Sequence, residues 1–176
     1  HACIRPYALD EKELAAAPEQ TKHAPVKAGK AKGLYEYSIA VSPMDCMGCG
    51  VCIGMCKVDA IKMIPAEEEF EQQESFDYCA LHVSVKPETV DLTMKGMQFK
   101  HPLLEYSGSC AGCAETSYAR IVSQMFGDRM YISNATGCSS IWGGPAATSP
   151  YTVNHEGHGP AWSNSLFEDN AEFGLG

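Results

Sequence analysis

The sequence lacks the features that would place a protein in a membrane or on a nucleic acid. A membrane-spanning helix needs about 20 consecutive apolar residues, and no apolar run in this sequence comes close to that length. The opening residues have neither the charged start nor the apolar stretch of a signal peptide, so we do not expect one here. Basic residues are also few, with 13 Lys and Arg against 22 Asp and Glu and a net charge of −9. Nucleic-acid surfaces need a basic excess, whereas an acidic surface suits a partner with a basic face.

The composition is that of a folded globular chain. Of the 176 residues, 45% are hydrophobic and 20% are charged, and the length allows one domain or two small ones. The sequence does not open with Met, and its last residues, DNAEFGLG, look like part of a continuing helix. We therefore expect a piece of a longer polypeptide.

The cysteines favour metal binding over a disulfide framework. There are nine of them, an odd number, and four lie within the eleven residues from Cys46 to Cys56. Neighbouring members of that group are too close to form unstrained local disulfides, whereas one tight loop can wrap a small inorganic cluster. The full set is Cys3, Cys46, Cys49, Cys52, Cys56, Cys79, Cys110, Cys113 and Cys138.

The first constellation has the spacing C-x2-C-x2-C-x3-C over Cys46, Cys49, Cys52 and Cys56. This is the spacing of bacterial ferredoxins and predicts a [4Fe–4S] cluster, while zinc sites usually draw two pairs across a longer spacer. In ferredoxins with two clusters, the fourth Cys of each run ligates the other cluster. Cys56 is then expected to serve a cluster whose remaining ligands precede His1. In bacterial ferredoxins the last Cys of this run is followed by Pro, whereas Lys57 follows Cys56 here. We treat this departure as tolerated variation.

The second constellation is incomplete. Cys110 and Cys113 form a C-x2-C pair, and Cys138 follows after a predicted helix and strand that return the chain close to its start. Three thiolates are one short of a complete site, so the spacing leaves a cluster and a zinc site both open. Glu115 follows the pair, either as a favourable charge in the first helical turn or as an acid that faces a cofactor. Cys3 and Cys79 are expected to be structural thiols.

Periodicity and turn residues predict the elements around these cysteines. The pattern indicates an α+β ferredoxin-like domain over 1–100 and the beginning of an α/β domain over 101–176. The expected elements of the first part are an extended piece at 3–6, a linker or surface excursion at 11–33 with one helical turn over 11–16, strands at 34–41 and 60–64, and an exposed acidic helix or loop at 67–77. Those of the second part are a helix at 113–126, a strand at 130–133, a long ordered loop at 143–164 and a capped helix from Ser165.

Four stretches together resemble one enzyme family. They are PMDCMGCGVCIGMCKVDAI, EYSGSCAGCAETSYARI, ISNATGCSSIWGG and GHGPAWSNSLFEDNAEFGLG. The chain resembles pyruvate:ferredoxin (flavodoxin) oxidoreductase, also called pyruvate synthase, over nearly its whole length. The likeness is most specific from Tyr106 to Gly176, which reads as the start of the family's thiamine-diphosphate domain.

The resemblance implies a function and a set of cofactors. The family consists of cytoplasmic homodimers that hold thiamine diphosphate, Mg²⁺ and three [4Fe–4S] clusters in each subunit. They convert pyruvate and coenzyme A to acetyl-CoA and CO₂ and pass the electrons to ferredoxin or flavodoxin. The resemblance also implies that the family's Mg²⁺ motif follows the present sequence, so this chain alone is not expected to be active.

The resemblance further implies roles for individual residues. Cys46, Cys49 and Cys52 match ligands of one cluster, and Cys56 matches a ligand of a second. Cys110, Cys113 and Cys138 match ligands of the third, whose fourth ligand is a Cys near the family's C-terminus. Glu115 and Cys138 match positions beside thiamine diphosphate. Two alternatives stay open at this point: a stand-alone ferredoxin-type electron carrier and a zinc-stabilised interaction domain.

Overall fold

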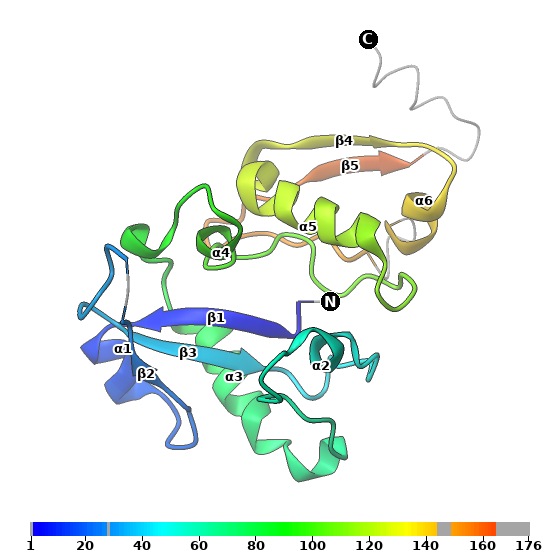
Figure 1. The fold of residues 1–176 in the computed structure, drawn as a ribbon. Helices are drawn as coiled ribbons and strands as arrows, with labels where there is room; N and C mark the ends of the chain where they lie inside the picture. The colour runs from blue at the N-terminus through cyan, green and yellow to red at the C-terminus, as the bar shows by residue number, and fades with distance from the viewer. Residues whose placement is uncertain (1, 28, 144–148, 165–176) are drawn as a thin grey trace. The chain divides into compact units, whose positions relative to one another are not determined.

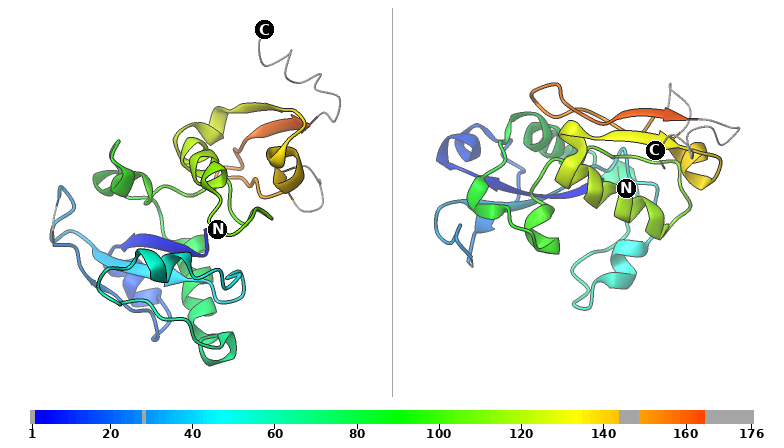
Figure 2. Two further views of the ribbon diagram at one scale, coloured as in Figure 1. Left: turned by 45° about the vertical axis from the view of Figure 1, so that its right-hand side comes forward. Right: turned by 90° about the horizontal axis from the view of Figure 1, so that it is seen from above.

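A computed structural model describes residues 2–27, 29–143 and 149–164. The chain forms two compact units. The first runs from Cys3 to Lys100, and the second begins at His101 and also takes in Ala2. The elements of each unit can be followed in Figure 1 and, from two further directions, in Figure 2.

The first unit is built on a small antiparallel sheet. Strands β1 (Ile4–Leu9), β3 (Glu36–Val41) and β2 (Ala24–Pro25) lie in the order β1-β3-β2. The register pairs the two ends of β1 with the opposite ends of β3, as Ile4 with Val41 and Leu9 with Glu36. The predicted extended pieces at 3–6 and 34–41 are therefore confirmed as partners in one sheet.

Helix α3 (Glu71–His82) packs against β3 and closes the core of this unit. The acidic segment predicted at 67–77 does form a helix, but the helix extends to His82 and is only partly exposed. One face is buried because Phe76 and Cys79 pack into the core. The buried core consists of Leu9, Ala40, Phe76, Cys79 and Val83.

The segment predicted as a linker at 11–33 belongs to the fold. The expected helical turn is α1 (Glu11–Ala16), with Asp10 as its N-cap. Leu14 and Ala17 pack against the core, and β2 adds to the edge of β3. These few apolar contacts and the strand pairing attach a polar, Lys-rich segment, most of whose residues are exposed or half-buried, to the sheet.

The strand expected at 60–64 is absent from the structure. Residues 57–65 run as turns and extended chain without strand pairing. The amide of Ala60 donates to Cys56 Sγ at 3.3 Å, and the amide of Asp59 to the Cys56 carbonyl at 3.5 Å. The backbone donors that a strand would use are therefore turned back toward the cysteine loop. Short elements complete this unit: α2 (Val51–Met55), η1 (Ala66–Glu68), η2 (Pro87–Thr89) and α4 (Met94–Met97).

The second unit contains the predicted helix and strand. Helix α5 (Ala114–Phe126) begins after Cys113 and is followed by η3 (Gly127–Arg129) and β4 (Tyr131–Asn134). Strand β4 pairs in parallel with β5 (Ala161–Asn164), and α6 spans Cys138–Gly143. Strand β5 lies within the segment that was predicted to be a loop, so that prediction was wrong at 161–164. The helix predicted from Ser165 lies outside the described residues.

Helix α5 has the predicted helical spacing but buries its polar side. Thr116, Ser123 and Gln124 are buried, whereas Tyr118 is 71% exposed and Val122 is 39% exposed. In the described ranges, no helix has both the length and the apolar character needed to span a membrane.

Candidate metal centre

Glycines shape the loop that carries the first cysteine run. Gly48 and Gly50 adopt φ values of 67° and 70°, in the left-handed region that side chains disfavour. Gly50 also precedes α2 as its N-cap. Two left-handed glycines between Cys46 and Cys52 suit a chain that wraps a compact cluster.

Helix α2 separates the last two cysteines of the run. Cys52 lies in its first turn, and Cys56 is the C-cap, with its N–H bonded to the Ile53 carbonyl at 3.0 Å. The chain after Cys56 folds back so that backbone N–H groups surround the sulfur. The amide of Val58 contributes most, followed by that of Ala60, and together they lower the pKa of the Cys56 thiol. Such a set of amides stabilises a thiolate, the form that binds metal.

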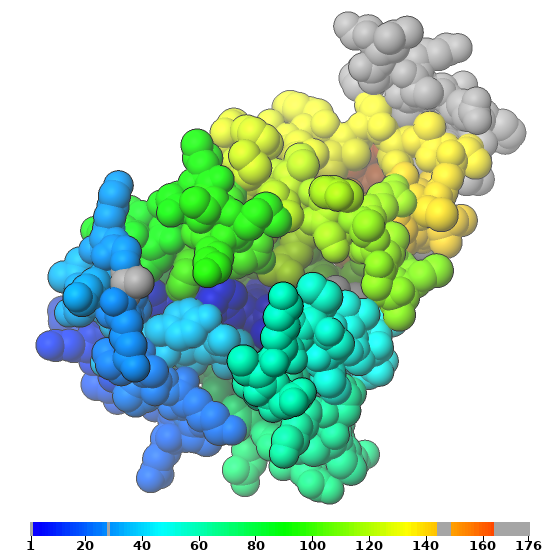
Figure 3. All heavy atoms as spheres, in the orientation of Figure 1, coloured from blue at the N-terminus to red at the C-terminus, as the bar shows by residue number. Residues whose placement is uncertain are grey.

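The surroundings of this loop are apolar but open. Met44 is 73% exposed, Val51 45% and Met55 74%. Figure 3 shows the α2 segment on the surface of its unit. Val51 and Met55, which lie next to Cys52 and Cys56 in sequence, therefore leave this loop open to water.

The second cysteine pair occupies a tight turn. The N–H of Cys113 donates to the carbonyl of Cys110 at 3.1 Å, and Gly112, between them, has a φ of 73°. A positive φ at the third residue is what a type II turn requires, and glycine adopts it without strain. Cys113 then serves as the N-cap of α5, and the turn holds the two cysteines together at the start of that helix.

Cys138 is reached through β4 and opens helix α6. A local network fixes the start of this helix: the Ser140 hydroxyl donates to the Gly137 carbonyl at 2.7 Å, and the Gly137 N–H donates to Ser140 Oγ at 3.0 Å. Cys110 and Cys138 are exposed, and Cys113 is half-buried. The order of helix, strand and helix is the predicted one, but Cys110, Cys113 and Cys138 do not form a group that could hold a metal ion among the described residues.

A group of aromatic residues in the second unit was missed by the sequence analysis. The ring of Tyr151 lies 6.4 Å from that of Trp142 and 6.2 Å from that of Trp162. Burial, and after it the charge of Glu115, raises the pKa of Tyr151. Glu115 itself is exposed in the first turn of α5. The structure thus brings the predicted acid near an aromatic group formed by segments far apart in the sequence.

The two remaining cysteines have different surroundings. Cys79, on the buried face of α3, is fully buried in the core, and burial, with a smaller effect of Glu13, raises the pKa of its thiol to about 11. It is a structural thiol, as expected. Cys3 is half-buried, and burial followed by the neighbouring Cys46 raises the pKa of its thiol to about 11 as well.

The described part of the chain contains no preformed binding site for a single metal ion. Across those residues, no three Cys, His, Asp or Glu side chains are grouped closely enough to hold one metal ion. A [4Fe–4S] cluster makes a different demand, because its four thiolates bind separate iron atoms at the corners of a cube. The left-handed glycines and the amides around Cys56 fit that demand.

Comparisons with known proteins agree on the first cysteine run and extend to the whole chain. A family model described as a 4Fe-4S binding domain matches residues 39–62. The match confirms the predicted iron–sulfur domain and does not favour zinc. The chain is 54% identical over its whole length to a pyruvate:ferredoxin oxidoreductase of Moorella thermoacetica and 52% identical to a pyruvate-flavodoxin oxidoreductase of Klebsiella pneumoniae. It is also 50% identical to a protein of Cryptosporidium parvum named pyruvate dehydrogenase [NADP(+)].

These relatives are much longer than the present chain. The chain spans 15% of the length of each of the two bacterial proteins and 9% of the Cryptosporidium protein. The four sequence stretches indicated a resemblance to these proteins. That similarity extends over all of the present chain, which corresponds to one part of each longer relative.

Proposed function

We propose that this chain is the electron-transfer segment of a cytoplasmic, homodimeric 2-oxo-acid oxidoreductase that acts on pyruvate. The full protein would convert pyruvate and coenzyme A to acetyl-CoA and CO₂ and pass electrons to ferredoxin or flavodoxin. The observation that carries this proposal is the 54% identity, over the whole chain, to a protein named for that activity. The 4Fe-4S match at 39–62 supports the electron-transfer role.

The first unit would hold parts of two clusters. In this proposal Cys46, Cys49 and Cys52 bind one [4Fe–4S] cluster and Cys56 binds another. Support comes from the loop conformation at Gly48 and Gly50 and from the backbone amides that favour a thiolate at Cys56. The residues of this unit would therefore position ligands and set the charge around them.

The second unit would be the beginning of a thiamine-diphosphate domain. Cys110, Cys113 and Cys138 are proposed to bind the third cluster, and Glu115 and Cys138 to lie beside thiamine diphosphate, with the Mg²⁺ ligands elsewhere in the protein. The turn that joins Cys110 to Cys113 and the closeness of Glu115 to Tyr151 support this arrangement. A partly buried aromatic group with a carboxylate in its surroundings suits a cofactor with an aromatic ring, since it offers both an apolar wall and a hydrogen-bond acceptor.

The chemistry explains why such segments occur together. When bound, thiamine diphosphate stabilises the carbanion that decarboxylation produces, and the clusters carry electrons one at a time. The role of this chain is to hold the cluster ligands and one wall of the cofactor site. A stand-alone electron carrier would not need the second unit, and the whole-length similarity to pyruvate oxidoreductases does not favour that alternative.

The test is an assay of the anaerobically purified holoprotein that contains this chain. We expect acetyl-CoA formation from pyruvate and coenzyme A, coupled to reduction of ferredoxin or flavodoxin, and about twelve iron atoms per chain. NADP⁺ belongs in the same assay as an acceptor, because one relative is named for it. Cys49→Ser should remove iron and acceptor reduction, whereas Cys79→Ala, on the buried face of α3, should retain both. A holoprotein with full iron content that does not consume pyruvate would contradict the proposed substrate.

A further inference from the structure

A buried serine attaches the start of the first cysteine loop to the protein. Strand β3 ends at Val41, and the next residue, Ser42, is fully buried, with its N–H donating to the Cys3 carbonyl at 2.8 Å. The Ser42 hydroxyl accepts from the Asp45 N–H at 3.3 Å. Its single hydrogen is shared between Asp45 Oδ2 at 2.5 Å and Gln73 Oε1 at 2.8 Å. Since Gln73 belongs to α3, these bonds connect the loop to that helix.

Gln73 is the partner from a distant part of the sequence. Its Oε1 also accepts from the Met44 N–H at 3.2 Å, across 29 residues, and its Nε2 donates to Asp77 Oδ1 at 2.8 Å. The neighbours determine the orientation of the amide, because a backbone N–H only donates and an ionised carboxylate only accepts. The bonds to Ser42 and Met44 therefore fix the backbone just before Cys46. The bond to Asp77 holds the amide against its own helix.

The exposure of the loop makes this connection important. Cys46 and Cys49 are exposed, so packing around their side chains contributes little to their positions. Gln73 is half-buried and lies three residues before Phe76, which packs in the core of the unit. Its amide thus joins an open loop to a helix that the core holds in place.

We infer that Gln73 positions Cys46 for the cluster that Cys46, Cys49 and Cys52 are proposed to bind. The inference rests on the proposed function, because it takes Cys46 to be a cluster ligand. A group that fixes the backbone of a ligand sets the direction from which the thiolate meets iron. Such outer groups influence both the retention of the metal and its reduction potential. Gln73 is thus a positioning residue and not a ligand.

The experiment compares two substitutions of Gln73 in the full, anaerobically purified holoprotein. Gln73→Leu removes the acceptor, and we expect this variant to lose about four iron atoms per chain to an iron chelator about tenfold faster than the wild type. Gln73→Glu keeps an oxygen that can accept from both Ser42 and Met44. Its added charge near Asp77 has a small effect, so its rate of iron loss should stay within about twofold of the wild type.

The redox properties provide a readout that general loosening of the fold would not give. In an EPR-monitored redox titration, one cluster of Gln73→Leu should have a changed midpoint potential, and the other clusters should keep theirs. Gln20→Leu is the matched control, because Gln20 Nε2 donates to the Glu71 carbonyl at 3.2 Å and to Glu74 Oε2 at 2.7 Å on the same helix. The control should keep the wild-type rate of iron loss and all potentials.

The results that overturn the inference are distinct from those that contradict the proposed function. Cys46→Ser should lower the iron content, and retention of all iron would show that Cys46 is not a ligand, which contradicts the proposed function at this residue. If Cys46→Ser does lose iron, wild-type iron loss and potentials in Gln73→Leu would overturn the positioning role. Equal changes in Gln73→Leu and Gln20→Leu would overturn it too, because they would trace the effect to α3 and not to the loop.

Discussion

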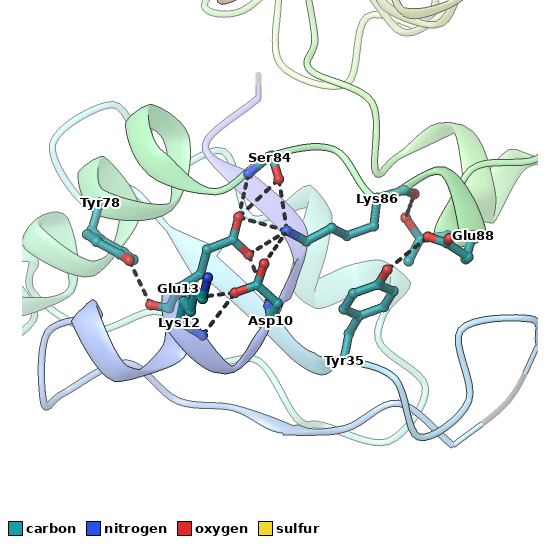
Figure 4. Close-up of polar contacts among 9 residues, drawn as sticks. Asp10, Lys12, Glu13, Tyr35, Tyr78, Ser84, Lys86 and Glu88 are labelled. Carbon is teal, nitrogen blue, oxygen red and sulfur yellow. Dashed lines mark hydrogen bonds and ion pairs between the residues drawn. The ribbon is translucent and has the colours of Figure 1, made fainter.

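Lys86 forms an ion pair with Glu13 across 73 residues of sequence. Lys86 Nζ lies 2.7 Å from Glu13 Oε2, with the two side chains 8% and 14% exposed. The same ammonium group donates to Asp10 Oδ2 at 3.1 Å and to Ser84 Oγ at 2.8 Å. Figure 4 shows these groups converging on Lys86, which thereby connects the start of α1 to the segment after α3.

Glu13 also completes the cap of α1. The Asp10 carboxylate accepts from the N–H of Glu13 at 2.9 Å, and the Asp10 N–H donates to Glu13 Oε2 at 3.0 Å. This reciprocal pattern is a capping box. The hydroxyl of Tyr78, in α3, donates to the Glu13 carbonyl at 2.6 Å. One short helix is therefore attached to the core by both its backbone and its side chains.

Replacement of Lys86 by Met should destabilise the first unit. The change leaves the carboxylates of Glu13 and Asp10 without their cation, and loss of one partner of a buried pair costs about 3 kcal/mol. Urea unfolding of the metal-free protein, followed by circular dichroism, measures this free energy. Lys12→Met, an exposed position on the same helix, should change it by less than about 0.5 kcal/mol. Equal stability of the two variants would contradict the assigned role of Lys86.

The same cluster should make stability depend on acidic pH. The N–H of Glu13, and after it Lys86, lowers the pKa of Asp10. Burial alone would raise the pKa of Glu13, but the bonds from Lys86, Ser84 and Asp10 outweigh it and the pKa is lowered. Carboxylates with depressed pKa values stabilise the fold above their ordinary values of 3.8 and 4.5 and lose that contribution as the pH falls through the folded values.

The expected result is a stability that is level near pH 7 and declines below about pH 4.5. Urea unfolding of the metal-free protein between pH 7 and pH 3 measures the decline. Because Lys86→Met removes a cause of both pKa shifts, its decline should be smaller than that of the wild type. An equal decline in the two proteins would show that other carboxylates dominate.

Gly50 and Gly54 offer a matched pair of substitutions around α2. Gly50 has a φ of 70°, so Gly50→Ala should cost about 1 kcal/mol and reduce iron incorporation into the first cysteine run. Gly54 lies inside α2 in open space and outside the left-handed region, so Gly54→Ala should leave iron incorporation unchanged. Iron and sulfide analysis after anaerobic reconstitution gives the comparison. Equal incorporation by both variants would mean that the loop conformation does not limit cluster binding.

Cys110→Ser tests the second constellation in the holoprotein. Serine is a poor ligand for iron in such clusters, so the variant should contain about four fewer iron atoms per chain and reduce its acceptor more slowly. The KM for pyruvate should change less than the rate of electron transfer. Ala111→Ser places the same side chain at the next position of the turn and serves as the control. Wild-type acceptor reduction by Cys110→Ser would show that Cys110 is not a ligand.

Local patterns predicted the elements that local interactions stabilise. The helix at 113–126 follows from apolar spacing and ends at Gly127, and the helical turn at 11–16 is stabilised by a local capping box between Asp10 and Glu13. Strand β5 was missed because its partner β4 lies about 30 residues earlier in the sequence. The four residues of β5, AWSN, contain no local pattern that predicts this pairing. The strand expected at 60–64 fails for the converse reason, since its amide at Ala60 is bonded to Cys56.

The sequence by itself indicated the kind of metal site, because the C-x2-C-x2-C-x3-C spacing lies within the eleven residues from Cys46 to Cys56, where the 4Fe-4S family model also matches. The same is true of the family resemblance, which rests on linear motifs. Only the tertiary structure decided which distant groups meet. The pairing of β1 with β3, the ion pair of Lys86 with Glu13 and the aromatic group at Tyr151 each join segments that are far apart in sequence. The physical reason is that burial and strand pairing choose these neighbours, and both depend on how the whole chain packs.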